Sequence, residues 1–141
     1  KRNRRIFINH ILMIKLKELM GDTTSTAGVL MNYDGEYLLL KRSSGKFSIP
    51  KGHIKEGESP LEGAQRELYE ETMITLSKTP KLLFTTTNKE GGGYYIYGYQ
   101  LTTRVIPHLN EEHIGYGYFN KNNIPTHLDK GLRKLFNSYG I

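Results

Sequence analysis

The chain has 141 residues, which is enough for one compact domain with its own core. It contains no cysteine, so disulfides and thiolate metal sites are excluded, and any metal must be bound by oxygen or imidazole. The formal net charge of +6 attracts polyanions. No apolar run is long enough to span a membrane, and the lack of cysteine fits a reducing cytoplasm.

Residues 1–22 are expected to form a separate basic arm followed by an amphipathic helix. Four of the first five residues are Lys or Arg, and charged side chains at Lys15, Lys17 and Glu18 interrupt the apolar residues of segment 6–20. No small-residue cleavage site follows, so a signal peptide is not predicted. The arm could contact nucleic acid or remain a solvated tail, and the sequence leaves both open.

A β-hairpin is predicted next. Residues 23–32 and 36–42 are rich in β-branched and apolar residues, and Asp34-Gly35 between them is a tight-turn signal. Residues 43–57 contain several glycines and a proline and are expected to form a loop.

A helix should follow, running to about Thr72. Ser59 suits the N-cap, Pro60 suits the first helical position, and Glu62 completes a capping box.

Strands, loops and a closing helix are expected in the rest of the chain. A strand is expected over 74–88, with an interruption near Pro80, and another over 94–101. A polar loop over 110–117, a short strand from 118 and a helix over 126–138 follow. This order predicts an α/β fold with a mixed sheet between helices.

Three acidic residues share one face of the first predicted helix of this domain. Glu67, Glu70 and Glu71 have the spacing i, i+3 and i+4. Like charges so placed repel each other, and a divalent cation would compensate because carboxylates are natural ligands of Mg²⁺. The alternative is a solvated polar face.

The spacing continues beyond these three residues. Gly52 is followed by five residues and then Glu58, and seven residues later the chain reads Arg66-Glu67-Leu68-Tyr69-Glu70-Glu71. This resembles the Nudix box, G-x5-E-x7-R-E-U-x-E-E-x-G-U, in which U is aliphatic. Met73 stands where the family usually has glycine, so we expect a different helix exit, with a longer final turn.

The resemblance implies a Nudix-type α/β/α sandwich over residues 23–141. It also implies a hydrolase that uses Mg²⁺ or Mn²⁺ to cleave a phosphoanhydride bond in a nucleoside diphosphate-linked substrate. Glu70 and Glu71 would bind the metal, and Glu67 would be a ligand or the general base.

The other residues of the box receive supporting roles from the same resemblance. Arg66 would orient Glu67 through a salt bridge, although a surface pair with Glu62 is also open. Glu58 would support the geometry of loop and helix. A backbone carbonyl of Gly52, or of Lys51 before it, would ligate the metal.

A second acidic cluster lies in the later polar loop. Glu112 is the preferred candidate of the pair Glu111-Glu112 for a further base or metal ligand, by resemblance to relatives that take a carboxylate from this region. The alternative is a solvated loop. His113 is expected to be a hydrogen-bonded structural residue.

Substrate contacts are expected from basic and aromatic residues. Lys41, Arg42 and Lys51 lie near the loop that faces the metal helix in the family, and they could bind phosphates. Tyr97 shares a strand face with residues 95 and 99 and could stack on a nucleobase. Solvent exposure and ordinary sheet packing are the competing interpretations.

The segment Pro50-Lys51-Gly52-His53 is similar to that of diadenosine polyphosphate hydrolases, so a dinucleoside polyphosphate is the favoured substrate. A nucleoside triphosphate, including an oxidised one, comes next, followed by ADP-ribose, nucleotide sugars and RNA 5′ ends. A module that binds nucleotides without cleaving them is less favoured, because such modules typically lose the glutamates that this chain keeps.

Overall fold

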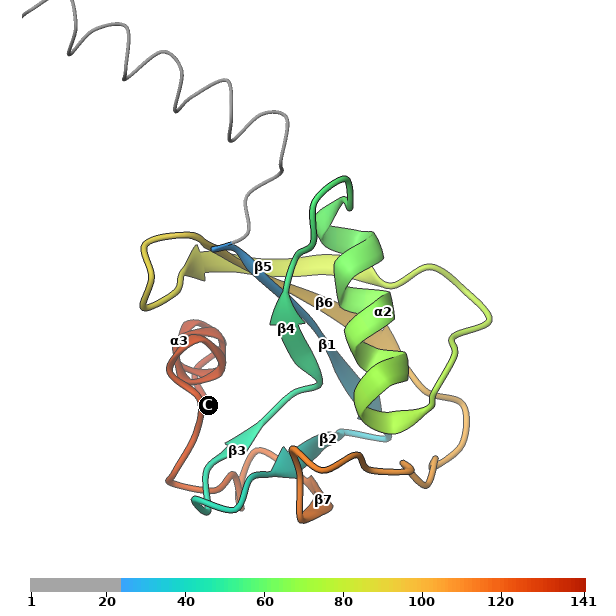
Figure 1. Ribbon diagram of the computed structural model, residues 1–141. Coiled ribbons are helices and arrows are strands. Elements are labelled where there is room, and N and C mark those ends of the chain that lie inside the picture. Colours follow the sequence, from blue (N-terminus) through green and yellow to red (C-terminus); the bar gives the residue numbers. More distant parts are fainter. Residues whose placement is uncertain (1–23) are drawn as a thin grey trace, which may run out of the picture.

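The computed structural model describes residues 24–141, so the predicted arm and helix over residues 1–22 lie outside the described residues. Within the described part, seven strands form one sheet and two helices pack against it (Figure 1). The elements are β1 (Thr26–Tyr33), β2 (Glu36–Lys41), β3 (Phe47–Ser48), β4 (Lys51–His53), α2 (Pro60–Thr72), β5 (Lys81–Thr87), β6 (Gly93–Gln100), β7 (Gly115–Phe119) and α3 (Lys130–Ser138).

The sheet is mixed, as predicted. Its main strand order is β3-β2-β1-β6-β5, with β4 paired to β1 and β7 paired to β2. Strands β1 and β6 run parallel, and all other pairs of the sheet are antiparallel. No helix among residues 24–141 has the length and apolar character needed to cross a membrane.

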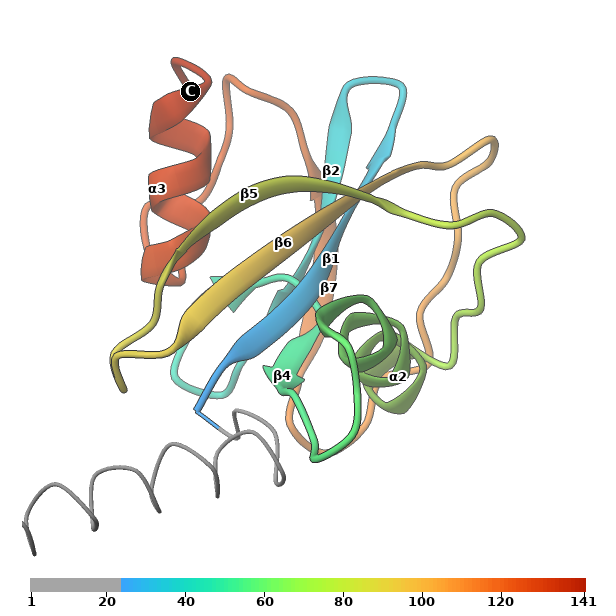
Figure 2. The ribbon, with the colours of Figure 1, turned by 90° about the horizontal axis from the view of Figure 1, so that it is seen from above.

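Helices α2 and α3 lie on opposite faces of the sheet, which confirms the predicted α/β/α sandwich (Figure 2). One core cluster joins α2 to the sheet through Ala64 and Leu68, which pack with Val29 and Met31 of β1. The other cluster, around Phe136, joins α3 to the opposite face. Both helices are therefore fixed by burial of their apolar sides.

The β1–β2 hairpin forms as predicted, with Tyr33 opposite Glu36. Asp34 and Gly35 both have positive φ, 49° and 80°, as a tight two-residue hairpin turn requires. The Asn32 side chain accepts a hydrogen bond from the Gly35 amide at 3.0 Å and holds the turn.

The start of α2 also confirms the prediction, because both hydrogen bonds of the capping box are present. The Glu62 amide donates to Ser59 Oγ at 3.1 Å, and the Ser59 amide donates to Glu62 Oε1 at 3.0 Å.

The expected longer final turn of α2 is wrong. Met73 is itself the C-cap and adopts the left-handed conformation, with φ 60° and ψ 20°. Its amide donates to the Tyr69 carbonyl at 2.8 Å, and its side chain is 60% exposed. Methionine thus occupies the conformation that glycine adopts most easily, and the chain turns sharply at the usual place.

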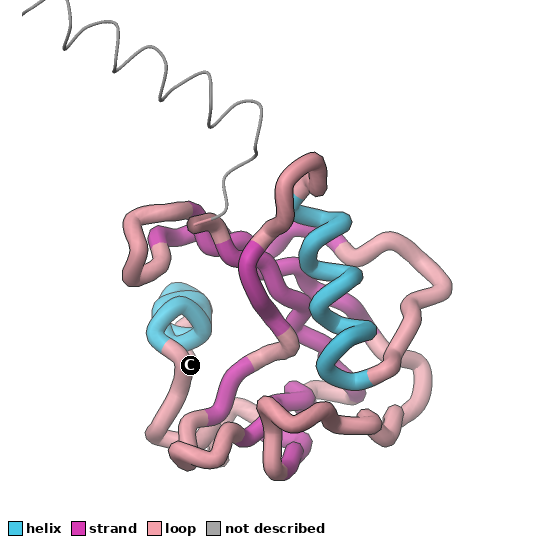
Figure 3. The backbone as a smooth tube through the Cα atoms, in the orientation of Figure 1, coloured by secondary structure: helices cyan, strands magenta, loops and turns pink. Residues whose placement is uncertain are grey.

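The predicted loop over residues 43–57 contains two short strands, β3 and β4 (Figure 3). Neither has enough residues to show an alternating pattern, and each exists because a longer strand pairs with it. The approach of the two segments is close: a Cβ on Gly28 of β1 would lie 2.6 Å from the Pro50 carbonyl oxygen. Pairing between distant segments therefore overrides the local glycine and proline signals.

Three other predicted boundaries are wrong. The strand expected over 74–88 is confined to β5. Before it, Ser77 and Lys78 hydrogen-bond to the side-chain hydroxyl of Tyr99 and not to the backbone of a neighbouring strand. Strand β7 begins at residue 115, three residues early, because it pairs along β2. Helix α3 begins at residue 130, since residues 127–129 hydrogen-bond to the backbone of Phe47 and Asp129 is the N-cap.

Candidate functional site

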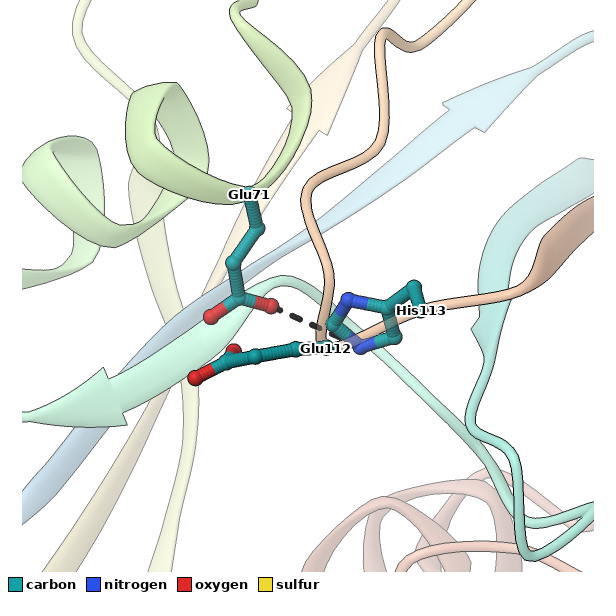
Figure 4. A group of neighbouring side chains, drawn as sticks. All are labelled: Glu71, Glu112 and His113. Atoms are coloured by element: carbon teal, nitrogen blue, oxygen red, sulfur yellow. Dashed lines mark ion pairs between the residues drawn. The ribbon is translucent and has the colours of Figure 1, made fainter.

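Glu71, Glu112 and His113 meet beside the C-terminal end of α2 (Figure 4). Glu71 comes from the last turn of α2, and the other two come from the loop between β6 and β7. One ligand atom from each residue lies within 4.8 Å of the others, so the three could hold one metal ion. The topology therefore joins the helix and the later loop in one cluster.

The carboxyl group of Glu71 is fully buried and lacks hydrogen bonds to the described residues. It is 1% exposed, and neither of its oxygens has a hydrogen-bond partner among residues 24–141. Burial raises its pKa to about 9, and the nearby carboxylates of Glu67 and Glu112 add to the effect. Without an ion Glu71 is therefore protonated at neutral pH. Its ionised form would be buried without a partner, which is costly, so the site fits a bound cation that displaces the proton and satisfies both oxygens.

His113 lies against Glu71 and is 5% exposed. Its Nε2 is 3.6 Å from Glu71 Oε1, and neither ring nitrogen has a hydrogen-bond partner in the described part of the chain. Burial lowers the pKa of His113 to about 4, with further lowering by the charges of Arg42 and Lys51. The expectation of a hydrogen-bonded structural ring is therefore wrong, and the imidazole stays neutral at pH 7.

Glu67 reaches the backbone of β4 at Gly52. A Cβ built on Gly52 would lie 2.2 Å from the carboxyl carbon of Glu67, so no larger residue fits there without displacing that carboxylate. The structure thus places the Glu67 side chain directly against the β4 backbone, where only glycine leaves room for it.

Arg66 joins the loop before α2 to the acidic face of the helix. Its Nε and Nη2 donate to the two oxygens of Glu58 at 2.6 and 3.0 Å, and Nη1 donates to Glu67 at 2.9 Å and Glu70 at 3.0 Å. Nη2 also donates to the His53 carbonyl at 2.9 Å. The open alternative, a pair with Glu62, is not formed because Glu62 belongs to the capping box.

These contacts shift both partners in the expected directions. The hydrogen bond from Arg66 lowers the pKa of Glu58, and the same bond is the main cause that raises the pKa of Arg66. Both side chains are therefore charged at neutral pH, and the fork of Arg66 fixes the loop relative to the helix.

A cleft of about 1120 Å³ lies beside this cluster. Glu67, Glu112 and Gly52 line it, together with the turn between β5 and β6 and the start of α3. Four acidic and seven basic side chains are on its walls, so it carries an excess of positive charge. The basic residues are Arg42, Lys46, Lys51, Lys55, Lys89, Lys130 and Lys134.

Two ion pairs connect β4 to other walls of the cleft. Lys51 Nζ is 3.2 Å from Asp129 Oδ1 at the start of α3, and it also lies 5.5 Å from the centre of the Tyr94 ring. His53 Nε2 is 3.1 Å from Glu90 Oε1 in the turn between β5 and β6. The short strand β4 is thus linked by ion pairs to α3 and to the β5–β6 turn, which both line the cleft.

The structure does not bring all the predicted residues to the cleft. Arg42 and Lys51 line it, but Lys41 does not, and its Nζ lies 5.8 Å from the centre of the Phe47 ring. Tyr97 is 9% exposed and packs in the core under α2. Neighbouring positions of a strand face opposite sides, so Tyr94 of β6 lines the cleft instead.

Sequence reasoning did not find Asp129, Lys130 and Lys134 on the cleft wall. One signal was available: an aspartate directly before a helical apolar pattern is a preferred N-cap, and the two lysines follow it on one helix face. These three residues are far in sequence from the acidic residues of α2, so the sequence alone did not indicate that they share a cleft with them.

The sequence of the chain is similar to that of a known protein family. A family model described as the NUDIX domain matches residues 22–138. The chain is 32% identical over 97 residues to the putative hydrolase 111R of Invertebrate iridescent virus 3, covering 64% of this chain and 56% of the viral protein. It therefore spans only about half the length of that relative.

Solved structures show the same fold. The MutT protein from Methanosarcina mazei Go1 is similar with a TM-score of 0.69 and 26% identity, over 83% of this chain and 92% of that one. A C. elegans Ap4A hydrolase is similar with a TM-score of 0.68 and 21% identity, over 82% and 95% of the two chains. Together with the family match over most of its length, this establishes that the chain belongs to the Nudix domain family.

Proposed function

We propose that this protein is a metal-dependent hydrolase that cleaves a phosphoanhydride bond in a nucleoside diphosphate-linked substrate. The observation that carries the proposal is Glu71, a buried carboxylate without a hydrogen-bond partner in the described residues, clustered with Glu112 beside a cleft rich in cations. A divalent ion would neutralise the carboxylates of Glu71 and Glu112, and the phosphates of a substrate would neutralise the cations of the cleft.

Mg²⁺ or Mn²⁺ is the proposed ion, held by Glu67, Glu71, Glu112 and the backbone carbonyl at Gly52. Oxygen ligands of this kind suit both ions. Glu70 is 46% exposed and accepts a hydrogen bond from Arg66, so it would become a ligand only after its side chain turns away from that arginine.

The reaction joins a water oxygen to phosphorus while the bridging P–O bond breaks, and the bridging oxygen leaves with the bonding electron pair. When bound, the ion supplies charge neutralisation at the phosphates and a more acidic water. Glu112 is exposed in the cleft, so one of its carboxylate oxygens would hold the ion while the other accepts the proton of the attacking water. Arg66 would hold Glu67 in place, and Arg42 would bind a phosphate.

A dinucleoside polyphosphate is the proposed substrate. Seven cationic side chains around the cleft suit a phosphate chain longer than a diphosphate, and a volume of about 1120 Å³ accommodates more than one nucleotide unit. One of the proteins with the same fold, from C. elegans, is an Ap4A hydrolase.

The test is turnover of a substrate panel with Mg²⁺ or Mn²⁺. The panel comprises dinucleoside polyphosphates, nucleoside triphosphates including an oxidised one, ADP-ribose, a nucleotide sugar and triphosphorylated or capped RNA. We expect the highest kcat/KM for a dinucleoside polyphosphate. Nucleotide binding without turnover of any member would contradict the proposal and favour a binding module.

The neighbouring glutamates of the later loop offer a matched pair of variants. Glu112 belongs to the cluster, whereas Glu111 is also exposed but lies outside both the cluster and the cleft lining. Glu112→Gln should lower kcat by about a hundredfold or more, the scale of a lost general base. Glu111→Gln should leave kcat within about twofold of the wild type, which controls for loop charge.

A further inference from the structure

We propose that His113 is itself a ligand of the bound ion, so that the centre combines imidazole nitrogen with carboxylate oxygen and favours first-row transition metals over Mg²⁺. This inference rests on the proposed function, because it concerns the same ion. It changes the ligand set from all-oxygen to mixed.

The position of the ring is the first argument. His113 is 5% exposed and lies beside Glu71, which is 1% exposed, and both point to the same space as Glu112 (Figure 4). Two ligands of one ion lie at most about 4.2 Å apart when each bond is about 2.1 Å long. The ligand atoms of the cluster lie within 4.8 Å of one another, and the exposed Glu112 can adjust to close the difference.

The second argument is the lack of any other use for the ring. A buried imidazole normally donates from one nitrogen and accepts at the other. Among residues 24–141 neither nitrogen of His113 has a hydrogen-bond partner, and the distance of 3.6 Å to Glu71 Oε1 is too long for one. An ion between the imidazole and the carboxylate would satisfy both groups at once.

The third argument is the backbone that holds the ring. The His113 amide donates to the Asn110 carbonyl at 3.3 Å, and the next amide, of Ile114, donates to Lys41 of β2 at 2.8 Å. The loop is thus attached to the sheet immediately after His113, and the side chain is directed inward rather than into solvent. Ligands held by such attachments lose little freedom on binding.

The chemical consequence is selectivity. Imidazole binds Co²⁺, Ni²⁺ and Zn²⁺ well, whereas Mg²⁺ strongly prefers oxygen ligands. With a nitrogen ligand, the site should bind Co²⁺ more tightly than Mg²⁺ by a margin that depends on His113.

Pulsed EPR of the Mn²⁺-loaded full chain tests the ligand directly, without any need for activity. We expect the ¹⁴N modulation typical of a coordinated imidazole in the wild type. It should disappear in His113→Gln and persist in His108→Gln, an exposed histidine of the same loop that lies outside the cluster.

The proposal can be tested even if His113→Gln does not fold. A spectrum of bound Mn²⁺ without ¹⁴N modulation overturns the proposal, and so does modulation that persists in a folded His113→Gln. If that variant is unfolded, the nitrogen is traced by glutamine variants of the other histidines: all should keep the modulation, and its loss in any one overturns the proposal. These are His10, His53, His108 and His127.

Calorimetric titration separates a ligand from a residue that only positions Glu71. For a ligand, His113→Gln should weaken Co²⁺ binding by about tenfold or more, the scale on which metal centres respond to a lost partner, and Mg²⁺ binding much less. An equal loss for both ions would overturn the proposal.

Failure of this inference is distinguishable from failure of the proposed function. Mn²⁺ bound without nitrogen, together with turnover of the substrate panel, removes His113 from the ligand set and leaves the hydrolase intact. Absence of both metal binding and turnover would overturn both.

Discussion

Met73 holds a left-handed conformation that costs a residue with a side chain roughly 1 kcal/mol or more. Its side chain is 60% exposed and contributes little burial in return. Met73→Gly should therefore raise the free energy of unfolding by about 0.5 kcal/mol, after the larger entropy of glycine in the unfolded chain is counted. Urea denaturation measures it. Met73→Ala is the control, since it removes the side chain but not the strain, and an equal gain there would contradict the explanation.

Gly52 offers a prediction about activity rather than stability. A methyl group at this position would overlap the carboxylate of Glu67, which must then move from the proposed metal site. Gly52→Ala should lower kcat/KM by about a hundredfold, the effect of a displacement of roughly 1 Å at a reacting centre. Because the overlapping atoms are at the end of a flexible side chain, the melting temperature should change little.

Gly115→Ala is the control for this change, because Gly115 is also a strand glycine, in β7, and its added methyl group would meet no other atom within 4 Å. Its kcat/KM should stay within about twofold of the wild type. A comparable loss of activity in both variants would show that sheet distortion, and not displacement of Glu67, is responsible.

The position of a single residue could be predicted from the sequence where the spacing along a helix alone determines it. Glu67 and Glu71 could be placed on one helix face because helical periodicity relates them directly. Tyr97 could not be placed, because an alternating strand has two equivalent faces and only the packing of α2 decides which is buried. His113 could not be placed because its neighbour Glu71 is distant in sequence.

Among the elements, α3 shows how one side chain sets a boundary. Asp129 accepts a hydrogen bond from the Leu132 amide at 3.1 Å and thereby begins the helix. Asp129→Ala should lower the free energy of unfolding by about 1 kcal/mol, the usual effect of removing an N-cap. Asp129→Asn keeps the cap and should lose clearly less, although it removes the charge opposite Lys51. Thermal or urea denaturation measures both, and equal losses would assign the effect to the ion pair.

The elements differ in how far they could be predicted. Helix α2 could be located from its capping box and its first proline, because those signals act within a few residues. Strands β3 and β4 have two and three residues and depend on partners in β2 and β1. No local signal encodes such strands, so they were expected to be loop.

The whole cleft suggests how long a substrate the molecule prefers. Lys130 and Lys134 line it from α3, on the element opposite the acidic helix α2. Changing both to Ala should raise KM about tenfold for a substrate with four or more phosphates and have little effect on ADP-ribose, because each lost charge contact is worth a few tenths to about 1 kcal/mol. Steady-state kinetics on both substrates measures this.

Lys121→Ala is the control, because this exposed lysine lies outside the cleft lining. It should leave both KM values unchanged. If the double change raises KM equally for short and long substrates, the α3 lysines act through general attraction of anions and do not select chain length.

The proposed metal site also has a consequence for how the protein is made. Its residues are spread from Gly52 to His113, and Glu112 joins Glu71 only after β6 has paired with β1 across more than sixty residues of chain. A growing chain therefore cannot assemble the ion's ligands until almost the whole domain has left the ribosome. Ion capture then comes late in folding, so the ion should mainly slow unfolding and protect the finished molecule from turnover by proteases.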